Sequence, residues 1–149
     1  MGKTEWALTV PSTLSPEDLW NRIKDFHSLM WANVPVEKVG EISGTTVGAE
    51  RIVAGGPHET LREFDDEARR FVYTIDGFGG KNDVFEIICP PFTTDYKGVV
   101  QILPAEEGST GCRISWSASW KNVKLEGDEV YDRVNSVLAG ATQAAAALN

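Results

Sequence analysis

Residues 127–148, GDEVYDRVNSVLAGATQAAAAL, are predicted to form one long amphipathic helix. Apolar residues recur there at the i, i+3, i+4, i+7 spacing that places a stripe along one side of a helix. The stripe consists of Val130, Val134, Val137, Leu138, Ala141, Ala144, Ala145 and Leu148. Small side chains let a helix lie close to a neighbouring layer, so we expect the alanine-rich second half to pack tightly. The larger residues of the first half are expected to face a ligand cavity.

The chain before this helix has the pattern of seven β-strands. Residues 3–11 alternate apolar and polar side chains, which indicates a half-buried strand. Six further strands are predicted at Val36–Ile42, Ala49–Ala54, Glu59–Phe64, Arg70–Ile75, Thr94–Leu103 and Cys112–Trp120. Short turns rich in Gly, Asp and Glu separate most of them, which favours an antiparallel sheet. We therefore predict one α+β domain over residues 1–149.

Two short helices are expected between the first strand and the rest of the sheet. Ser15 and Pro16 provide a cap and a first helical residue for a helix over residues 16–26. A second helix is predicted over residues 28–32. The segment 78–92 is the least regular part of the chain, and its apolar centre, Val84–Ile88, is interpreted either as a strand or as a lid.

Composition excludes several classes of partner. The formal net charge is −8 and the isoelectric point is near 4.7, so nucleic acid and anionic membrane surfaces are unfavourable partners. The longest apolar run is too short for membrane insertion. Cys89 and Cys112 lie in neither a disulfide nor a metal-binding pattern, which favours a cytoplasmic protein. We find no cofactor-binding motif and expect neither cofactor nor metal; a homodimer stays open.

Glu59 is the strongest candidate for an acid or base. Side chains two residues apart in a strand share a face, so an inward Leu61 takes Glu59 with it. A carboxyl group beside an apolar cavity should have a raised pKa and can then transfer protons. The alternative is a solvated glutamate at a strand end. A one-residue slip of the strand would instead turn His58 inward.

Aromatic residues on three strands are expected to line the same cavity. Tyr73 and Tyr96 share their faces with apolar residues, and a buried phenol needs a hydrogen-bond partner that a ligand carbonyl can supply. Ordinary core packing is the alternative. The remaining expected ligand contacts on these strands and on the second short helix are Ile75, Trp116, Ala118, Trp120 and, as a plug over the cavity mouth, Trp31.

The order of elements and several short sequences together indicate a family. The sequences are SPEDLW at residues 15–20, WANVP at 31–35, VGAER at 47–51, GPHETL at 56–61, DDEARRFVY at 65–73 and the strand around Trp116. In this order they resemble the START-like, or birch-pollen-allergen-like, superfamily, specifically its polyketide cyclase/dehydrase branch. The resemblance implies a helix-grip fold, in which a seven-stranded antiparallel sheet wraps around the long C-terminal helix.

A second resemblance concerns the entrance to the cavity. VAGGP at residues 53–57 is similar to the gate loop of plant abscisic-acid receptors, although Gly56 replaces their leucine. By this resemblance, Lys38 would point inward and pair with an anionic ligand. We expect residues 55–57 and the 78–91 insert to flank the entrance and to move when a ligand binds.

The superfamily contains enzymes and carriers, and both remain open for this chain. The resemblance implies a small hydrophobic molecule as the partner. A cofactor-independent cyclase or dehydratase acting on a carbonyl-rich, polyketide-like metabolite would use Glu59, Tyr73, Tyr96 or His58. A carrier or receptor would need only the apolar cavity. An inward cluster of charged and tyrosine side chains favours the enzyme, and a purely apolar lining favours the carrier.

Overall fold

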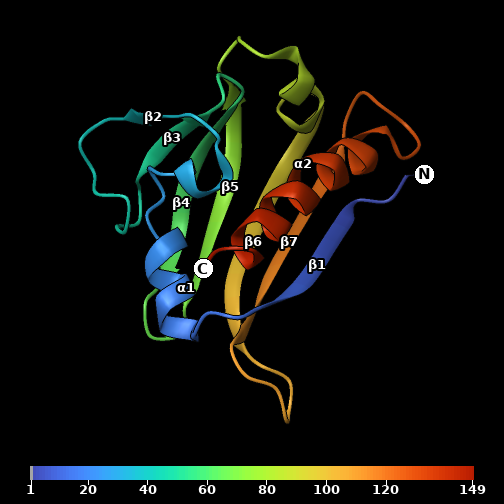
Figure 1. Ribbon diagram of the computed structural model, residues 1–149. Helices are drawn as coiled ribbons and strands as arrows, with labels where there is room; N and C mark the ends of the chain where they lie inside the picture. The colour runs from blue at the N-terminus through green and yellow to red at the C-terminus, as the bar shows by residue number, and fades with distance from the viewer. Residues whose placement is uncertain (1) are drawn as a thin grey trace.

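The computed structural model, which describes residues 2–149, folds into one curved antiparallel sheet with helices packed against it (Figure 1). The strands are β1 (Glu5–Ser12), β2 (Val36–Val39), β3 (Glu50–Val53), β4 (Pro57–Asp65), β5 (Arg70–Phe78), β6 (Thr93–Pro104) and β7 (Cys112–Asn122). Their order in the sheet is β1-β7-β6-β5-β4-β3-β2. The first strand thus pairs with the last and forms one edge of the sheet. The α+β helix-grip architecture is confirmed.

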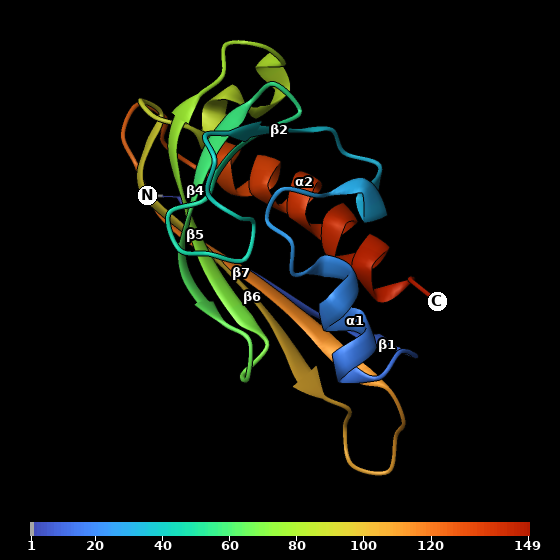
Figure 2. The ribbon, with the colours of Figure 1, turned by 90° about the vertical axis from the view of Figure 1, so that its left-hand side faces the viewer.

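The helices lie on one side of the sheet (Figure 2). They are α1 (Pro16–Ile23), the 3-10 turns η1 (Met30–Ala32) and η2 (Asp83–Ile88), and α2 (Glu129–Ala146). The hydroxyl of Ser15 accepts a hydrogen bond from the amide of Asp18 at 3.1 Å, which is the predicted cap of α1. Several elements differ from their predicted bounds. Helix α1 ends three residues before its predicted end, and β2 ends before Gly40, whose φ is +76°. Val84–Ile88 belongs to a 3-10 turn, so of its two interpretations the strand is wrong.

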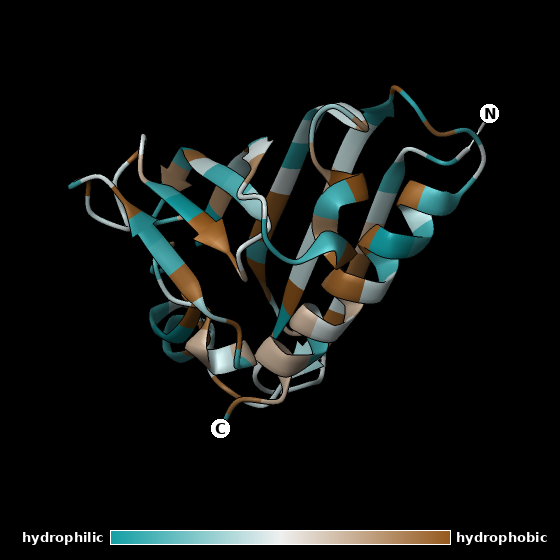
Figure 3. Ribbon diagram, turned by 90° about the horizontal axis from the view of Figure 1, so that it is seen from above, coloured by the Kyte–Doolittle hydropathy of each residue, from teal (hydrophilic) through white to brown (hydrophobic). Residues whose placement is uncertain are grey.

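Helix α2 packs mainly against β1 and β7, at one edge of the sheet. The indole of Trp6 on β1 donates to Oδ1 of Asn135 on α2 at 2.8 Å. Apolar and polar residues alternate along the strands and along α2 (Figure 3). On β7 the predicted alternation is confirmed, because Trp116, Ala118 and Trp120 are buried while the intervening serines are partly exposed. Because α2 packs at the β1–β7 edge, it does not directly cover the opposite half of the inner face, which belongs to β3, β4 and β5.

Helix α1 closes the lower end of the core. Its Leu19, Trp20 and Ile23 are buried. The Trp20 ring packs 5.5 Å from that of Phe64, and its Nε1 donates to Oδ1 of Asp66 at 2.7 Å. This hydrogen bond satisfies the only polar atom of the indole, so a large aromatic side chain is buried without an unpaired donor.

Gly98 on β6 provides room for a tyrosine on the neighbouring strand. The register pairs Tyr73 of β5 with Gly98, and a Cβ at this position would overlap the phenol ring of Tyr73. The ring therefore lies across the backbone of β6, and its position depends on the missing side chain.

We predict that Gly98→Ala lowers the free energy of unfolding by about 1–3 kcal/mol, because the new methyl group overpacks the core and displaces Tyr73. Gly140→Ala is the control. Gly140 lies on α2, and a Cβ added there would have no other atom within 4 Å, so alanine should stabilise the helix by about 1 kcal/mol. Chemical denaturation measures both. Equal stability of Gly98→Ala and wild type would show that Tyr73 does not occupy this space.

Candidate functional site

A cavity of about 420 Å³ lies between the sheet, α2 and the two 3-10 turns. Most of its wall is apolar. The lining residues are Leu29, Ala32, Val34, Arg51, Val53, Pro57, Glu59, Tyr73, Ile75, Phe85, Ile88, Tyr96, Trp116, Val137, Leu138, Gly140 and Ala141. A volume of this size accommodates a small organic molecule, and an apolar wall with a few polar groups is typical of ligand pockets.

The polar part of the wall is built around a buried ion pair between Arg51 and Glu59. Arg51 Nε donates to Glu59 Oε1 at 2.8 Å, and Arg51 Nη2 lies 2.6 Å from the same oxygen. Both side chains are almost fully buried, at 3% and 8% exposure. The second carboxylate oxygen, Oε2, has no hydrogen-bond partner within residues 2–149. Glu59 lines the cavity, so this oxygen is available to a ligand.

The hairpin of β3 and β4 explains why these two residues meet. The turn at residues 54–56 pairs Arg51 with Glu59 across the hairpin, and Ala54 and Gly55 adopt the positive φ values that the turn requires. Arg51 is held from a second side as well. Its Nη1 donates to the carbonyl of Phe26 at 2.9 Å, and its guanidinium lies 3.8 Å from the centre of the Phe26 ring. The charge is thus fixed by three partners.

Burial raises the pKa of Glu59 above its usual value, and the charge and hydrogen bonds of Arg51 offset part of this effect. A buried carboxylate is costly unless a cation compensates it, and Arg51 supplies that compensation. The arrangement gives a carboxyl group of increased proton affinity on the wall of an apolar space, which is the property required of a general acid or base.

Two phenols extend this polar wall. Tyr73 Oη accepts a hydrogen bond from Trp116 Nε1 at 3.1 Å, and the phenol of Tyr96 lies beside it. Burial and the charge of Glu59 raise the pKa of Tyr73, and burial raises that of Tyr96, so both hydroxyls keep their protons. Because Tyr73 accepts from Trp116, its own proton can be donated to a ligand oxygen.

The structure brings together part of the predicted site. Glu59, Tyr73, Tyr96, Ile75, Trp116 and Val137 all line the cavity. Leu61, Ala118, Trp120, Val130 and Val134 are buried but lie outside the lining, and contact between these residues and a ligand stays a prediction. Val130 and Val134 lie on α2, which packs mainly against β1 and β7, and Ala118 and Trp120 lie on β7 itself.

Three further predicted residues also lie outside the lining. Lys38 is exposed on β2, which lies at the edge of the sheet. His58 is one-third exposed, and its Nε2 lies 3.1 Å from Oε1 of Glu50. Trp31 is half-buried and packs 6.5 Å from the Trp116 ring; its Nε1 is inaccessible and has no hydrogen-bond partner in the described part of the chain. Trp31 thus supports the wall from behind.

Sequence reasoning missed Arg51, together with the apolar residues of η1 and η2 that line the cavity. The position of Arg51 could in principle have been predicted from the sequence. A hairpin with its turn at residues 54–56 places position 51 opposite position 59, and an inward Glu59 then requires an inward partner. The cavity contacts of Phe85 and Ile88 could not be predicted in this way, because apolar and polar residues follow no regular period in their segment.

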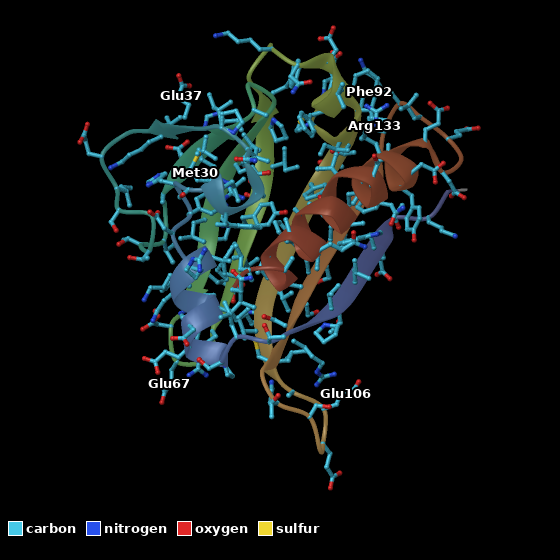
Figure 4. All side chains as sticks on the ribbon, viewed as in Figure 1. Met30, Glu37, Glu67, Phe92, Glu106 and Arg133 are labelled. Carbon is cyan, nitrogen blue, oxygen red and sulfur yellow. The ribbon has the colours of Figure 1, made fainter. Side chains whose placement is uncertain are left out.

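The gate-like loop and the 78–91 insert are bonded to each other. The amides of Gly79 and Lys81 donate to the carbonyls of Gly56 and Gly55 at 2.6 and 3.0 Å. Phe85 packs on Gly56, where a Cβ would lie only 2.9 Å from the Phe85 Cβ. Arg133 of α2, labelled in Figure 4, donates to the carbonyl of Val84. These contacts cover one end of the cavity; movement of both segments on ligand binding stays a prediction.

The fold and the cavity define a helix-grip protein with an apolar cavity of a size suited to a small hydrophobic ligand. Comparison with protein families agrees: residues 3–147 match the family described as polyketide cyclase / dehydrase and lipid transport. The chain belongs to this family, within the START-like, birch-pollen-allergen-like superfamily. A search of curated proteins finds no match. None of the helices in residues 2–149 is long and apolar enough to cross a bilayer.

Solved structures show the same fold. A protein from Nitrosospira multiformis is 26% identical, with a TM-score of 0.81 and coverage of 95% of this chain and 93% of that one. The protein XoxI from Bacillus cereus is 21% identical, with a TM-score of 0.75 and coverage of 97% and 94%. Ara h 8.0201 is 19% identical, with a TM-score of 0.66 and coverage of 95% and 93%. The likeness therefore extends over nearly the whole chain.

We predict that Arg51→Met lowers the free energy of unfolding by about 3–5 kcal/mol, because it leaves the carboxylate of Glu59 buried without its cation. Arg70→Gln is the matched control, since Arg70 pairs with Glu63 at 3.3 Å on the exposed part of the sheet. Loss of the Arg70–Glu63 pair should lower the free energy of unfolding by about 1 kcal/mol or less. Urea denaturation of both variants decides. Equal losses would mean that the Arg51–Glu59 pair is as well solvated as a surface pair.

We also predict that Arg133→Ala accelerates hydrogen exchange of the amides in residues 83–89 by about threefold or more, because η2 loses its hydrogen bond to α2. Arg113→Ala removes a comparable side-chain bond, to the carbonyl of Pro104, far from the insert. It should leave these amides unchanged. Unaltered exchange in Arg133→Ala would show that the contact does not hold the insert.

Proposed function

We propose that the protein is a cofactor-independent enzyme of the dehydratase or cyclase type, acting on a small hydrophobic metabolite that carries carbonyl and hydroxyl groups. One observation carries the proposal: the carboxylate of Glu59 is held through one oxygen by Arg51, leaves its other oxygen toward the cavity, and lies close enough to Tyr73 to raise its pKa. An acid–base group and a hydrogen-bond donor thus share one wall of the cavity.

The loss of water from a β-hydroxy ketone illustrates the chemistry. Glu59 Oε2 removes the proton from the carbon next to the carbonyl, while the hydroxyl of Tyr73 donates to the carbonyl oxygen as it gains negative charge. The protonated Glu59 then gives its proton to the departing hydroxyl group. The products are water and a conjugated enone, and the carboxylate is restored. Ring closure by aldol addition uses the same groups before this step.

The surrounding residues have supporting roles in the proposal. Arg51 keeps Glu59 in one orientation, and Trp116 orients the Tyr73 hydroxyl by donating to its oxygen. Tyr96 adds a second phenol beside it. The apolar wall, including Ile75 and Phe85, excludes water and binds the hydrocarbon part of the substrate. Neither a cofactor nor a metal takes part in the proposed reaction, and the two free thiols accord with a reducing, cytoplasmic location.

A carrier is the second candidate function. It is favoured by the predominance of aliphatic and aromatic side chains in the lining and by the bonded segments that cover one end of the cavity. In a carrier, Glu59 and Tyr73 would hold a ligand hydroxyl or carbonyl without moving protons. The two functions differ in turnover, not in binding.

We predict that Glu59→Gln reduces the rate of water loss from a naphthyl-substituted β-hydroxy ketone by about 10²-fold or more, the usual contribution of a positioned acid or base. The amide keeps the shape and one hydrogen bond to Arg51 but cannot accept a proton. Absorbance of the conjugated enone measures the rate, and calorimetry measures substrate binding, which should persist.

His58→Ala is the paired control, because His58 neighbours Glu59 but lies outside the cavity lining. Its rate should stay within about twofold of the wild-type rate. If His58→Ala removes activity and Glu59→Gln does not, the acid–base assignment is wrong. If the wild-type protein binds the ketone and never turns it over, the carrier function replaces the enzyme.

A further inference from the structure

The charged groups of the cavity cancel each other. Arg51 and Glu59 are the two lining residues with ionisable charges at neutral pH in the described part of the chain. We propose that this pair makes the cavity selective for uncharged ligands, and that the pair determines the charge of the ligand independently of any turnover. The inference rests on the ligand-binding part of the proposed function and names the chemical class of the ligand.

An anionic ligand finds no cation whose charge is not already matched by a protein carboxylate. Three of the five N–H groups of Arg51 have partners in the protein, since Nε and Nη2 contact Glu59 and Nη1 donates to Phe26, and the charge of Arg51 is matched by that of Glu59. One face of the guanidinium lies on the Phe26 ring. A ligand carboxylate would therefore meet the free oxygen of Glu59, a like charge, in a space with a mostly apolar wall.

A cationic ligand is disfavoured for the converse reason. Glu59 Oε2 can accept one hydrogen bond, but the charge of Arg51 lies 2.6 Å from the other oxygen of the same carboxylate. The cation would lose its hydration and gain only a carboxylate that is already neutralised. A neutral hydroxyl donor loses far less. It can donate to Oε2 and can accept from the hydroxyl of Tyr73, which lines the same wall.

One substitution should change this selectivity. Glu59→Gln keeps the size of the side chain and removes its negative charge, whereas arginine cannot lose its proton in a protein. The cavity then holds an uncompensated cation beside an open space. A ligand carboxylate can take the place of the missing charge, so the variant should favour anions.

Three probes with one ring system test the inference: 2-naphthol, 2-naphthoate and 2-naphthylmethylammonium, which are neutral, anionic and cationic at neutral pH. Their affinities are measured by isothermal titration calorimetry. Wild-type protein should bind the naphthol at least about tenfold more tightly than either ion, and Glu59→Gln should bind the naphthoate at least about tenfold more tightly than wild type does.

The double variant Arg51→Met/Glu59→Gln is the matched control. It retains the glutamine and removes the guanidinium, so the gain for naphthoate should disappear. The cavity is again uncharged, and replacement of both partners of a buried pair is commonly tolerated by the fold. Circular dichroism verifies that each variant is folded. If Glu59→Gln does not fold, the ranking of the three probes by wild-type protein alone still tests the inference.

Several results would overturn it. Wild-type protein that binds naphthoate or the ammonium probe as tightly as the naphthol has no charge selectivity. A naphthoate gain that persists in the double variant would not arise from Arg51. Failure of all three probes to bind would contradict a cavity for neutral aromatic ligands. Because these are equilibrium measurements, absent turnover would refute the proposed enzyme and leave the charge selectivity standing.

Discussion

The cavity exists because α2 covers only part of the inner face of the sheet. The helix packs on β1 and β7, where the indole of Trp6 donates a hydrogen bond to Asn135. A sheet of seven strands is wider than one helix, and its curvature carries β3 to β5 away from α2. The inner face of these strands is closed over by α1, η1 and η2, which leave about 420 Å³ unfilled. Close packing at one edge and an open space at the other thus follow from one geometric mismatch.

The same mismatch explains why a charged pair is tolerated inside the protein. An aliphatic side chain at position 51 or 59 would be exposed to the cavity rather than packed against a helix. Arg51 and Glu59 instead neutralise each other, and the guanidinium extends across to the carbonyl and ring of Phe26 just beyond α1. The pair therefore ties the β3–β4 hairpin to the segment that closes the lower end of the cavity. The second carboxylate oxygen of Glu59, Oε2, is the feature that distinguishes this cavity from a purely apolar one.

The aromatic residues divide into two groups with different surroundings. Trp120 and Tyr96 stack with ring centres 5.9 Å apart, and Trp120 donates to Asn122, so its indole is fully satisfied within the protein. Tyr73 accepts from Trp116 and lies over Gly98, with its hydroxyl on the cavity wall. The indole of Trp120 therefore takes no part in the cavity wall, whereas Tyr73 and Tyr96 both line it. A tyrosine whose oxygen already accepts one hydrogen bond is oriented before a ligand arrives, which favours specific binding of an oxygen acceptor.

The local features of this protein could be predicted from its sequence. Alternation along β7, the cap at Ser15 and the apolar stripe of α2 depend on side chains close together in the chain, and they led to the correct elements and to inward Glu59, Leu61, Tyr73 and Tyr96. Which inward residues meet the cavity, and which meet the helix, depends on the packing of the whole chain. Val134 and Trp120 are buried as Tyr73 is, yet they contribute to the packed layers, because the placement of α2 at one edge is a property of the entire sheet. The pairing of Arg51 with Glu59 likewise arises from the register between two strands, which is fixed only when the hairpin forms.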